Sequence, residues 1–315
     1  MKMGLSQAVD LYLRTRRRFG FALIQVGVEL HSLVRFAREN GHRGPLTTAL
    51  AIQWAQQPQR CASGYRVRRL NIARRLARFW HAYDPGVEIP AEISFGPIYR
   101  RRAVHIYSPK ELASLVKASV AMGRLHPLRA STFRTLVGLL VCTGMRIGEA
   151  LRLSDADIDW SARVLTIRRA KNGHTRLVPL QPSTVKSLQR YRQLRDQAIG
   201  SSGAPRFFVT LRARPLGQKG INAVFRKLCR TLGWTEAPVP RLHDLRHTFA
   251  VRTLLGWYQN QEPIGPKLWV LSTYLGHRHL ADTYWYLTAV PELMQLGLER
   301  FASAQTWASG GIGHE

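Results

Sequence analysis

Acidic residues are scarce in this chain, and their scarcity points to the kind of partner it binds. Only 19 of its 315 residues are Asp or Glu, against 47 Lys and Arg, so the formal net charge at pH 7 is +28. Self-repulsion of that size is tolerable only if something negative offsets it, which indicates a polyanion such as nucleic acid. Binding to structural RNA would call for the same charge, so composition leaves the kind of nucleic acid open.

Cysteines and long hydrophobic runs are also rare. Cys61, Cys142 and Cys229 lie far apart, fit no metal-ligand spacing and cannot all form disulfides, which is typical of proteins of the reducing cytosol. The longest apolar run, LVGLLVCTGM at 136–145, is too short to cross a bilayer. We therefore expect a cytoplasmic protein that is neither secreted nor membrane-spanning.

Hydrophobic residues make up 45% of the chain, which is typical of a folded globular protein, and the length suffices for two domains. Of the 47 basic residues, 39 are Arg. The planar guanidinium binds phosphate oxygens in pairs and is less costly to bury at an interface than the Lys ammonium. The composition therefore favours phosphate contacts along much of the chain.

The N-terminal part reads as a group of helices separated by Gly and Pro. The pattern predicts helices at 5–18, 22–40, 47–57 and 63–83. The last helix combines an apolar face with a row of arginines that have no acidic neighbours for ion pairing. A solvated helix face is the alternative, but we favour contact with DNA phosphates. The arginines of this row are Arg68, Arg69, Arg74, Arg75 and Arg78.

A proline-rich stretch separates this part from the next. It contains the basic run Arg100, Arg101 and Arg102, which we also expect to bind DNA, and it ends at SPKE, where Ser108 and Glu111 have the spacing of a helix capping box. We expect a helical DNA-binding domain at 1–95 and a basic linker at 96–107.

The second domain is predicted to be mainly helical with a small β-sheet. The run VLTIRRAKNGHTRLVPL has two β-like segments around an Asn-Gly turn, which predicts a β-hairpin. The fold class is therefore α+β. Helices are expected at 129–142, 183–198, 218–232, 243–256, 267–275 and 291–304.

The stretch VPRLHDLRHTF places charged groups beside an apolar helix face. His243 and Arg246 are three residues apart and so are neighbours on a helix. Such a pair suits a phosphodiester, because Arg can neutralise its oxygens while His moves a proton. Zinc binding by His243 and His247 is the alternative, since HDLRH resembles H-E-x-x-H. The positive surroundings oppose it.

Three other stretches carry isolated reactive groups. TGMRIGEALRL contains Arg146 and Glu149, AKNGHTR contains Lys171, and LGHRHLADTYWY contains His277 and Tyr286. Taken alone, the first pair could be a surface ion pair and the lysine a solvated turn residue. Tyr284 is the alternative to Tyr286 as the reactive tyrosine of the last stretch.

Together these motifs resemble the tyrosine recombinase (phage integrase) family, here of a mobile genetic element. The resemblance covers about 108–295 as the catalytic domain and leaves 296–315 as a tail, which in the family packs on the next protomer. Capping its own domain is the alternative for this tail. The resemblance implies one active site, which joins Arg146, Lys171, His243, Arg246, His277 and Tyr286, with Glu149 as a supporting acid.

The resemblance implies that Tyr286 attacks the scissile phosphate and forms a 3′-phosphotyrosyl link, which conserves the bond energy. Arg146 and Arg246 would hold the non-bridging oxygens. Because two guanidiniums supply the charge that a metal ion would bring, we expect no metal and no other cofactor.

The remaining implied roles concern protons and orientation. Lys171 would protonate the leaving 5′ oxygen, and His243 would accept the tyrosine proton. His277 would bind the phosphate, and Glu149 would orient an arginine or histidine of the site.

The expected function is that of a site-specific DNA recombinase of the integrase or transposase type. By the resemblance it would act as a homo-tetramer on double-stranded recombination sites, with accessory proteins as further partners. A type IB topoisomerase activity and a catalytically inactive DNA-binding regulator are the alternatives. The DNA sites, and the choice between integration, excision, inversion and transposition, stay open.

Overall fold

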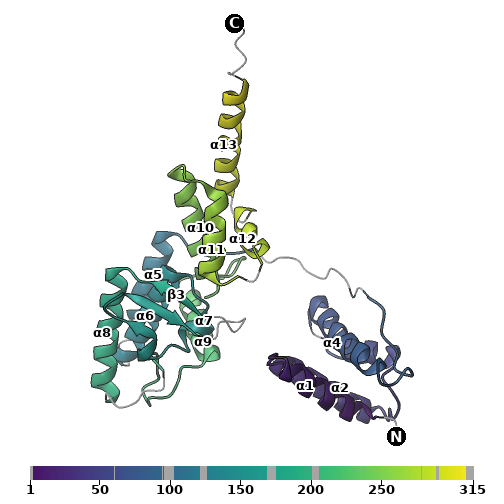
Figure 1. Ribbon diagram of the computed structural model, residues 1–315. Coiled ribbons are helices and arrows are strands. Elements are labelled where there is room, and N and C mark those ends of the chain that lie inside the picture. The colour runs from purple at the N-terminus through teal and green to yellow at the C-terminus, as the bar shows by residue number, and fades with distance from the viewer. Residues whose placement is uncertain are drawn as a thin grey trace. The chain divides into compact units, whose positions relative to one another are not determined.

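In the computed structural model the chain is mostly helical and has a three-stranded sheet, which confirms the predicted fold class. The chain divides into two compact units, Met1–Arg101 and Arg102–Glu315 (Figure 1). Within the described residues, no helix is long and apolar enough to cross a membrane. The structure describes residues 3–59, 61–93, 95, 103–120, 126–168, 175–200, 206–277, 279–288 and 291–309, without the side chains of 288 and 301–309.

The described part of the first unit has four helices, each of which begins and ends within two residues of a predicted range. Figure 1 shows α1, α2 and α4 running alongside one another, and the three are in mutual contact. Their apolar faces enclose a core that includes the fully buried side chains of Trp54 and Trp80. The helices are α1 (Leu5–Arg18), α2 (Ile24–Glu39), α3 (Thr48–Gln56) and α4 (Ser63–His81).

Two arginines of α4 lie in the interior of this unit. Arg69 is 3% exposed, and its guanidinium lies 4.1 Å from the ring centroid of Trp54 and, through Nε, 3.7 Å from Glu29. Arg74 is 9% exposed and donates to the carboxylate of Glu92 at 2.8 Å. Burial and pairing with carboxylates do not favour the expected phosphate contact of these two side chains, which stays a prediction.

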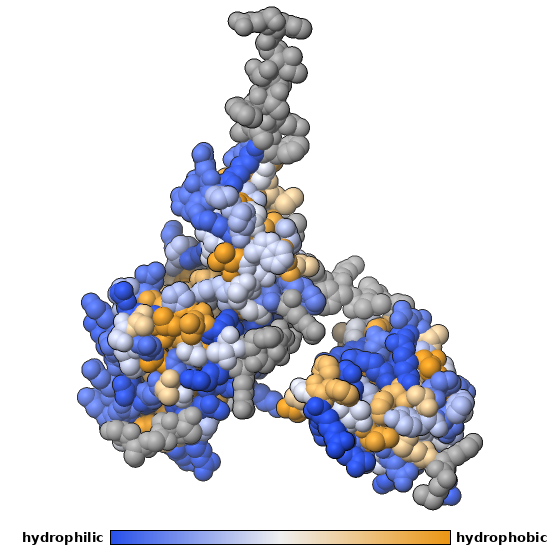
Figure 2. Space-filling view, viewed as in Figure 1, coloured by the Kyte–Doolittle hydropathy of each residue, from blue (hydrophilic) through white to orange (hydrophobic). Residues whose placement is uncertain are grey.

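The other three arginines of the row, Arg68, Arg75 and Arg78, are exposed. Seven and three residues separate them, so they share one face of α4. Their contact with phosphate stays a prediction. The predicted contacts at Arg100, Arg101 and Arg102 lie outside the described residues. On the visible face of both units, hydrophilic residues surround smaller hydrophobic areas (Figure 2).

The described part of the second unit contains the predicted helices. It also contains two short α-helices and two 3-10 turns that were not predicted. The helix α5 begins with the predicted capping box, in which the Glu111 N–H donates to Ser108 Oγ at 3.2 Å and the Ser108 N–H donates to the Glu111 carboxylate at 2.7 Å. The helices are α5 (Pro109–Val120), α6 (Pro127–Thr143), α7 (Ile147–Ala150), α8 (Pro182–Ile199), α9 (Gln218–Thr231), α10 (Asp244–Gln259), α11 (Ile264–Leu275), α12 (Ala281–Tyr284) and α13 (Pro291–Ser309), with the 3-10 turns η2 (Asp155–Asp157) and η3 (Trp285–Thr288).

The small sheet is antiparallel in the order β1-β2-β3. The predicted hairpin is confirmed, and the pairing of Leu165 with Val178 turns two buried side chains toward the core. The shorter strand β1 was not predicted. The strands are β1 (Ile158–Asp159), β2 (Val164–Ile167) and β3 (Arg176–Pro179).

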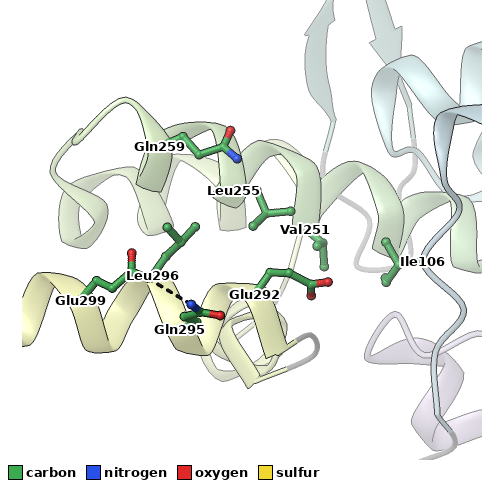
Figure 3. Close-up of a pocket in the computed structure, with 8 residues that line it drawn as sticks. All are labelled: Ile106, Val251, Leu255, Gln259, Glu292, Gln295, Leu296 and Glu299. Atoms are coloured by element: carbon green, nitrogen blue, oxygen red, sulfur yellow. Dashed lines mark hydrogen bonds between the residues drawn. The ribbon is translucent and has the colours of Figure 1, made fainter.

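The C-terminal helix α13 packs along α10 of the same chain. Leu293 is buried in a cluster with residues of α10 and α11, and Arg300 donates to the Tyr258 carbonyl near the end of α10 at 2.9 Å. A cavity of about 460 Å³ lies between the two helices, where Leu255 and Leu296 face each other (Figure 3). The part of α13 up to Arg300 thus contacts its own domain, and packing of the tail on a second copy stays a proposal.

Candidate active site

Two arginines meet the buried carboxylate of Glu149. Arg146 stands just before α7, where its backbone N–H donates to Glu149 Oε2 at 2.9 Å and its Nη1 donates to Oε1 at 3.1 Å. From the first residue of β3, Arg176 donates through Nη2 to Oε2 at 2.7 Å and through Nη1 to Oε1 at 3.1 Å. Burial alone would raise the pKa of Glu149, but hydrogen bonding and charge from Arg176, and then from Arg146, lower the pKa to about 2. The carboxylate is therefore ionised at neutral pH.

Arg246 projects from the first turn of α10 into the interior. It is 3% exposed, and it donates through Nη1 to the Gly144 carbonyl at 2.9 Å and through Nη2 to the Leu275 carbonyl at 2.8 Å. Burial, followed by the charge of Arg146, lowers the pKa of Arg246 to about 10, so it stays protonated at neutral pH. The two carbonyls thus fix its guanidinium between the ends of α6 and α11.

The turn after α6 requires glycine. Gly144 has φ of +58°, in the left-handed region, and a Cβ at this position would overlap the ring of Phe249. The turn after α11 is built in the same way, since Gly276 has φ of +66° and its carbonyl accepts from Arg146 Nη2 at 3.2 Å. The side chains of Arg146 and Arg246 are therefore both held by carbonyls of turns that need glycine.

His277 follows the second of these turns. Its Nδ1 lies 2.7 Å from the hydroxyl of Thr283, which is fully buried. Burial, followed by the charges of Arg246 and Arg146, lowers the pKa of His277 to about 4. The imidazole is therefore neutral at pH 7 and is held at Nδ1 by Thr283.

Tyr286 lies beside this histidine within η3 and is only 2% exposed. Its ring centroid is 6.0 Å from that of His277 and 5.5 Å from that of His247. Burial raises the pKa of Tyr286, and the charge and hydrogen bond of Arg246 partly offset that rise. Tyr284, the competing tyrosine of the sequence, is 49% exposed. The structure thus brings Tyr286 to the arginines and His277.

His243 stands directly before α10 at the surface of the site. Its ring meets that of His247 edge to face, with centroids 4.8 Å apart. Partial burial, followed by the charge of Arg246, lowers the pKa of His243, and burial lowers the pKa of His247 to about 3. In the part of the chain that the structure describes, no three His, Cys, Asp or Glu side chains form a group that could hold a metal ion.

The sequence motifs did not identify two residues of this cluster, Arg176 and Thr283, and one predicted residue cannot be placed in it. Lys171 is outside the described residues. Arg176 and Thr283 were missed, although the sequence holds a signal for the first. In the alternating pattern of RLVP, Arg176 falls on the same face as the buried Val178, where a charged side chain needs a partner.

Comparison with known proteins agrees with this fold. Residues 108–292 match the sequence profile described as the phage integrase family. The chain is 39% identical over 303 residues to protein y4rB of Sinorhizobium fredii, whose proposed role is integrase/recombinase, and the match covers 93% of this chain and 96% of that protein. It is 38% identical over 162 residues to the tyrosine recombinase XerC of Brucella suis biovar 1, across 51% of this chain and 47% of that protein.

Among solved structures, the Tn1549 transposon integrase in complex with circular intermediate DNA has the same fold. The TM-score is 0.65 with 16% identity, across 95% of this chain and 100% of that chain. Family profile, relatives and fold lead to one class, that of the tyrosine-type site-specific recombinases. The chain belongs to the phage integrase family.

Proposed function

We propose that the chain cleaves and rejoins double-stranded DNA at specific sites through a 3′-phosphotyrosyl intermediate on Tyr286. The observation that carries the proposal is the position of this buried phenol, which is stacked on His277 and lies near enough to Arg246 for that cation to lower the pKa of the phenol. A nucleophile held next to the cation that would bind the phosphate is what attack on phosphorus needs.

The proposed step is a transesterification. The Tyr286 phenol oxygen forms a bond to phosphorus, and the bond from phosphorus to the 5′ oxygen breaks. The phenol proton leaves for a base, and the departing 5′ oxygen gains a proton. Rejoining reverses both transfers, so the bond energy is conserved and no ATP is consumed.

Arg146 and Arg246 would hold the non-bridging oxygens as they gain charge. Each is fixed by backbone carbonyls, and a guanidinium has five N–H groups, so donors remain for a phosphate. Each is expected to lower the barrier by on the order of 3 kcal/mol, as a fixed oxyanion donor does. The two guanidiniums supply the positive charge, and the proposal therefore assigns no metal or other cofactor.

The histidines would act as neutral groups. Since the pKa of His243 is lowered, its imidazole can accept the proton of Tyr286 at neutral pH. With Nδ1 of His277 accepting from Thr283, its Nε2–H would donate to the phosphate. Lys171 is proposed to protonate the 5′ oxygen.

The rest of the chain would bind and arrange DNA. We propose that residues 1–95 contact the duplex through the exposed arginines of α4, that 96–107 form a basic linker, and that 108–295 carry out the chemistry. Residues 296–315 would pack on the next copy in a homo-tetramer. The Tn1549 integrase, which was solved with DNA, supports the choice of partner. We expect activity on the ends of a mobile element in the cytoplasm.

Detection of the covalent intermediate tests this proposal. Binding sites are first selected from a pool of random duplexes, and the selected site is then built into a nicked suicide substrate that releases a short strand after cleavage. The products are separated on a denaturing gel, and the adduct is digested and mapped. We expect a 3′-phosphotyrosine at Tyr286.

Other outcomes would support a different function. An adduct with relaxation of supercoiled plasmid and no strand exchange between two sites would favour a topoisomerase. Specific binding without an adduct would favour an inactive DNA-binding regulator. Strand exchange between paired sites would support the recombinase.

A further inference from the structure

We propose that Arg176 is a positioning residue for strand cleavage, which acts by holding Glu149 and, through it, Arg146. This inference rests on the proposed function. The structure already has the required contacts, because Arg176 of β3 binds both carboxylate oxygens of Glu149, while Arg146, directly before α7, binds the same carboxylate.

The position of Arg176 couples three parts of the site. Its backbone begins β3 and pairs with Ile167 of β2. Its side chain, 11% exposed, reaches Glu149. The guanidinium also rests against the turn that carries His277, because a Cβ at Gly276 would lie 3.2 Å from Nη1. A shift of this side chain would therefore disturb the carboxylate and the histidine turn together.

Charge gives Arg176 a second effect on the reaction. The three guanidiniums of Arg146, Arg176 and Arg246 and the carboxylate of Glu149 leave two net positive charges around the site. A phosphodiester carries one negative charge, and attack by a phenolate adds a second in the transition state. Without Arg176 the site would hold one net positive charge, and Arg146 alone would neutralise the carboxylate of Glu149.

A purely structural role is the competing explanation, since any buried carboxylate needs a counter-charge. The chain offers a matched control in Arg195 of α8. This arginine is 3% exposed and pairs with two carboxylates, Asp155 at 2.9 Å and Asp196 at 2.7 Å. Arg176→Gln and Arg195→Gln thus remove the same group from similar surroundings, and only the first touches the proposed site.

The experiment uses the full chain and the suicide substrate described above. The single-turnover rate of adduct formation, the Kd for the same DNA and the melting temperature are measured for wild type, Arg176→Gln, Arg176→Lys and Arg195→Gln. We expect Arg176→Gln to slow adduct formation by about 10- to 100-fold, as small misplacements of catalytic groups do, with DNA affinity retained. Arg176→Lys keeps the charge without the two-pronged contact and should restore part of the rate. Arg195→Gln should lower the melting temperature and leave the rate of the folded protein unchanged.

Two further measurements separate positioning from stability. If Arg176 acts through Glu149, the double variant with Glu149→Gln should be no slower than the slower single variant, because the two losses are not independent. Arg176→Gln should also steepen the loss of rate at acid pH that His243 begins, because the pKa of Glu149 rises when Arg176 is removed. A structural role would lower the rate equally at each pH.

Several outcomes would overturn the inference. A wild-type rate in Arg176→Gln, or losses that multiply in the double variant, would mean that Arg176 does not act through Glu149. If the glutamine variant fails to fold, a wild-type rate in Arg176→Lys has the same meaning. If the wild-type protein forms no adduct, the proposed function itself is wrong, and the inference that rests on it is wrong too.

Discussion

The phenol ring of Tyr286 lies nearly parallel to the imidazole of His277, with planes 22° apart and centroids separated by 6.0 Å. The histidine is fixed by the buried hydroxyl of Thr283, which lies between the two in the chain. The segment from the histidine to the tyrosine therefore folds back on itself through α12. This return places the proposed nucleophile and the proposed phosphate ligand side by side.

Tyr286→Phe is expected to abolish the covalent adduct and to leave DNA binding unchanged. The substitution removes only the attacking oxygen and keeps the ring that packs on His277 and His247. Denaturing gels of the suicide-substrate reaction give the readout, and a gel shift on the same duplex gives the affinity. Tyr284→Phe is the control and should form adduct normally, since that side chain is 49% exposed. Adduct that persists in Tyr286→Phe and maps to Tyr284 would contradict the assignment.

Cleavage should stay fast below the pH at which an ordinary histidine becomes charged. His243 must be neutral to accept a proton, and partial burial and Arg246 lower its pKa below the usual value of about 6.5. Activity is therefore present above the lowered pKa and is lost as the pH falls through it. Single-turnover rates between pH 5 and 8, roughly the range in which histidine titrates, provide the profile. An acid limb centred above the ordinary pKa, or one unchanged in His243→Gln, would count against this role.

The helices and the local motifs could be predicted from sequence because their signals are local. Amphipathic spacing and Gly or Pro punctuation located the helices of both units to within a few residues at most ends. The pairing of Arg146 with Glu149 likewise joins residues three apart on one turn. Contacts between distant segments left no such signal. Thr283 resembles any helix residue until its hydroxyl is found beside His277.

The arginines of α4 also show that contacts between distant segments could not be predicted from the sequence. Spacing along one helix could not tell that Arg69 faces a carboxylate on α2 while Arg68 faces solvent. Glu29 is itself 5% exposed and needs a cation in the interior, which a single-helix pattern does not reveal. The same holds for Arg176, which meets a carboxylate 27 residues away in the chain.

Gly144→Ala should destabilise the second unit and impair cleavage. The positive φ costs an L-residue about 1–2 kcal/mol, and the added methyl would displace the ring of Phe249 as well. The Gly144 carbonyl accepts from Arg246, so the displacement also moves a proposed phosphate ligand. Thermal unfolding and adduct rate are measured together. Gly256→Ala on α10 is the control, because no atom lies within 4 Å of the new Cβ, and it should be neutral or stabilising by up to about 1 kcal/mol.

Arg75→Ala is expected to affect DNA binding and Arg69→Ala the stability of the fold, although both residues lie on α4. Arg75 is exposed, so its loss should weaken DNA binding and reduce the salt slope of log Kd by about 1, the value for one phosphate contact, at an unchanged melting temperature. Arg69 is buried over Trp54 and paired with Glu29. Its loss leaves that buried carboxylate without its cation, so the melting temperature should fall, while the folded protein keeps the salt slope.

Salt titrations of binding at four or more ionic strengths, with calorimetry on the same samples, separate these effects. A lowered salt slope in Arg69→Ala would mean that this side chain leaves the interior when DNA binds. An unchanged slope in Arg75→Ala, with the same result for Arg68→Ala and Arg78→Ala, would move the DNA contacts of the first unit away from α4. The exposed face of that helix would then be a solvated surface, which is the alternative that its sequence left open.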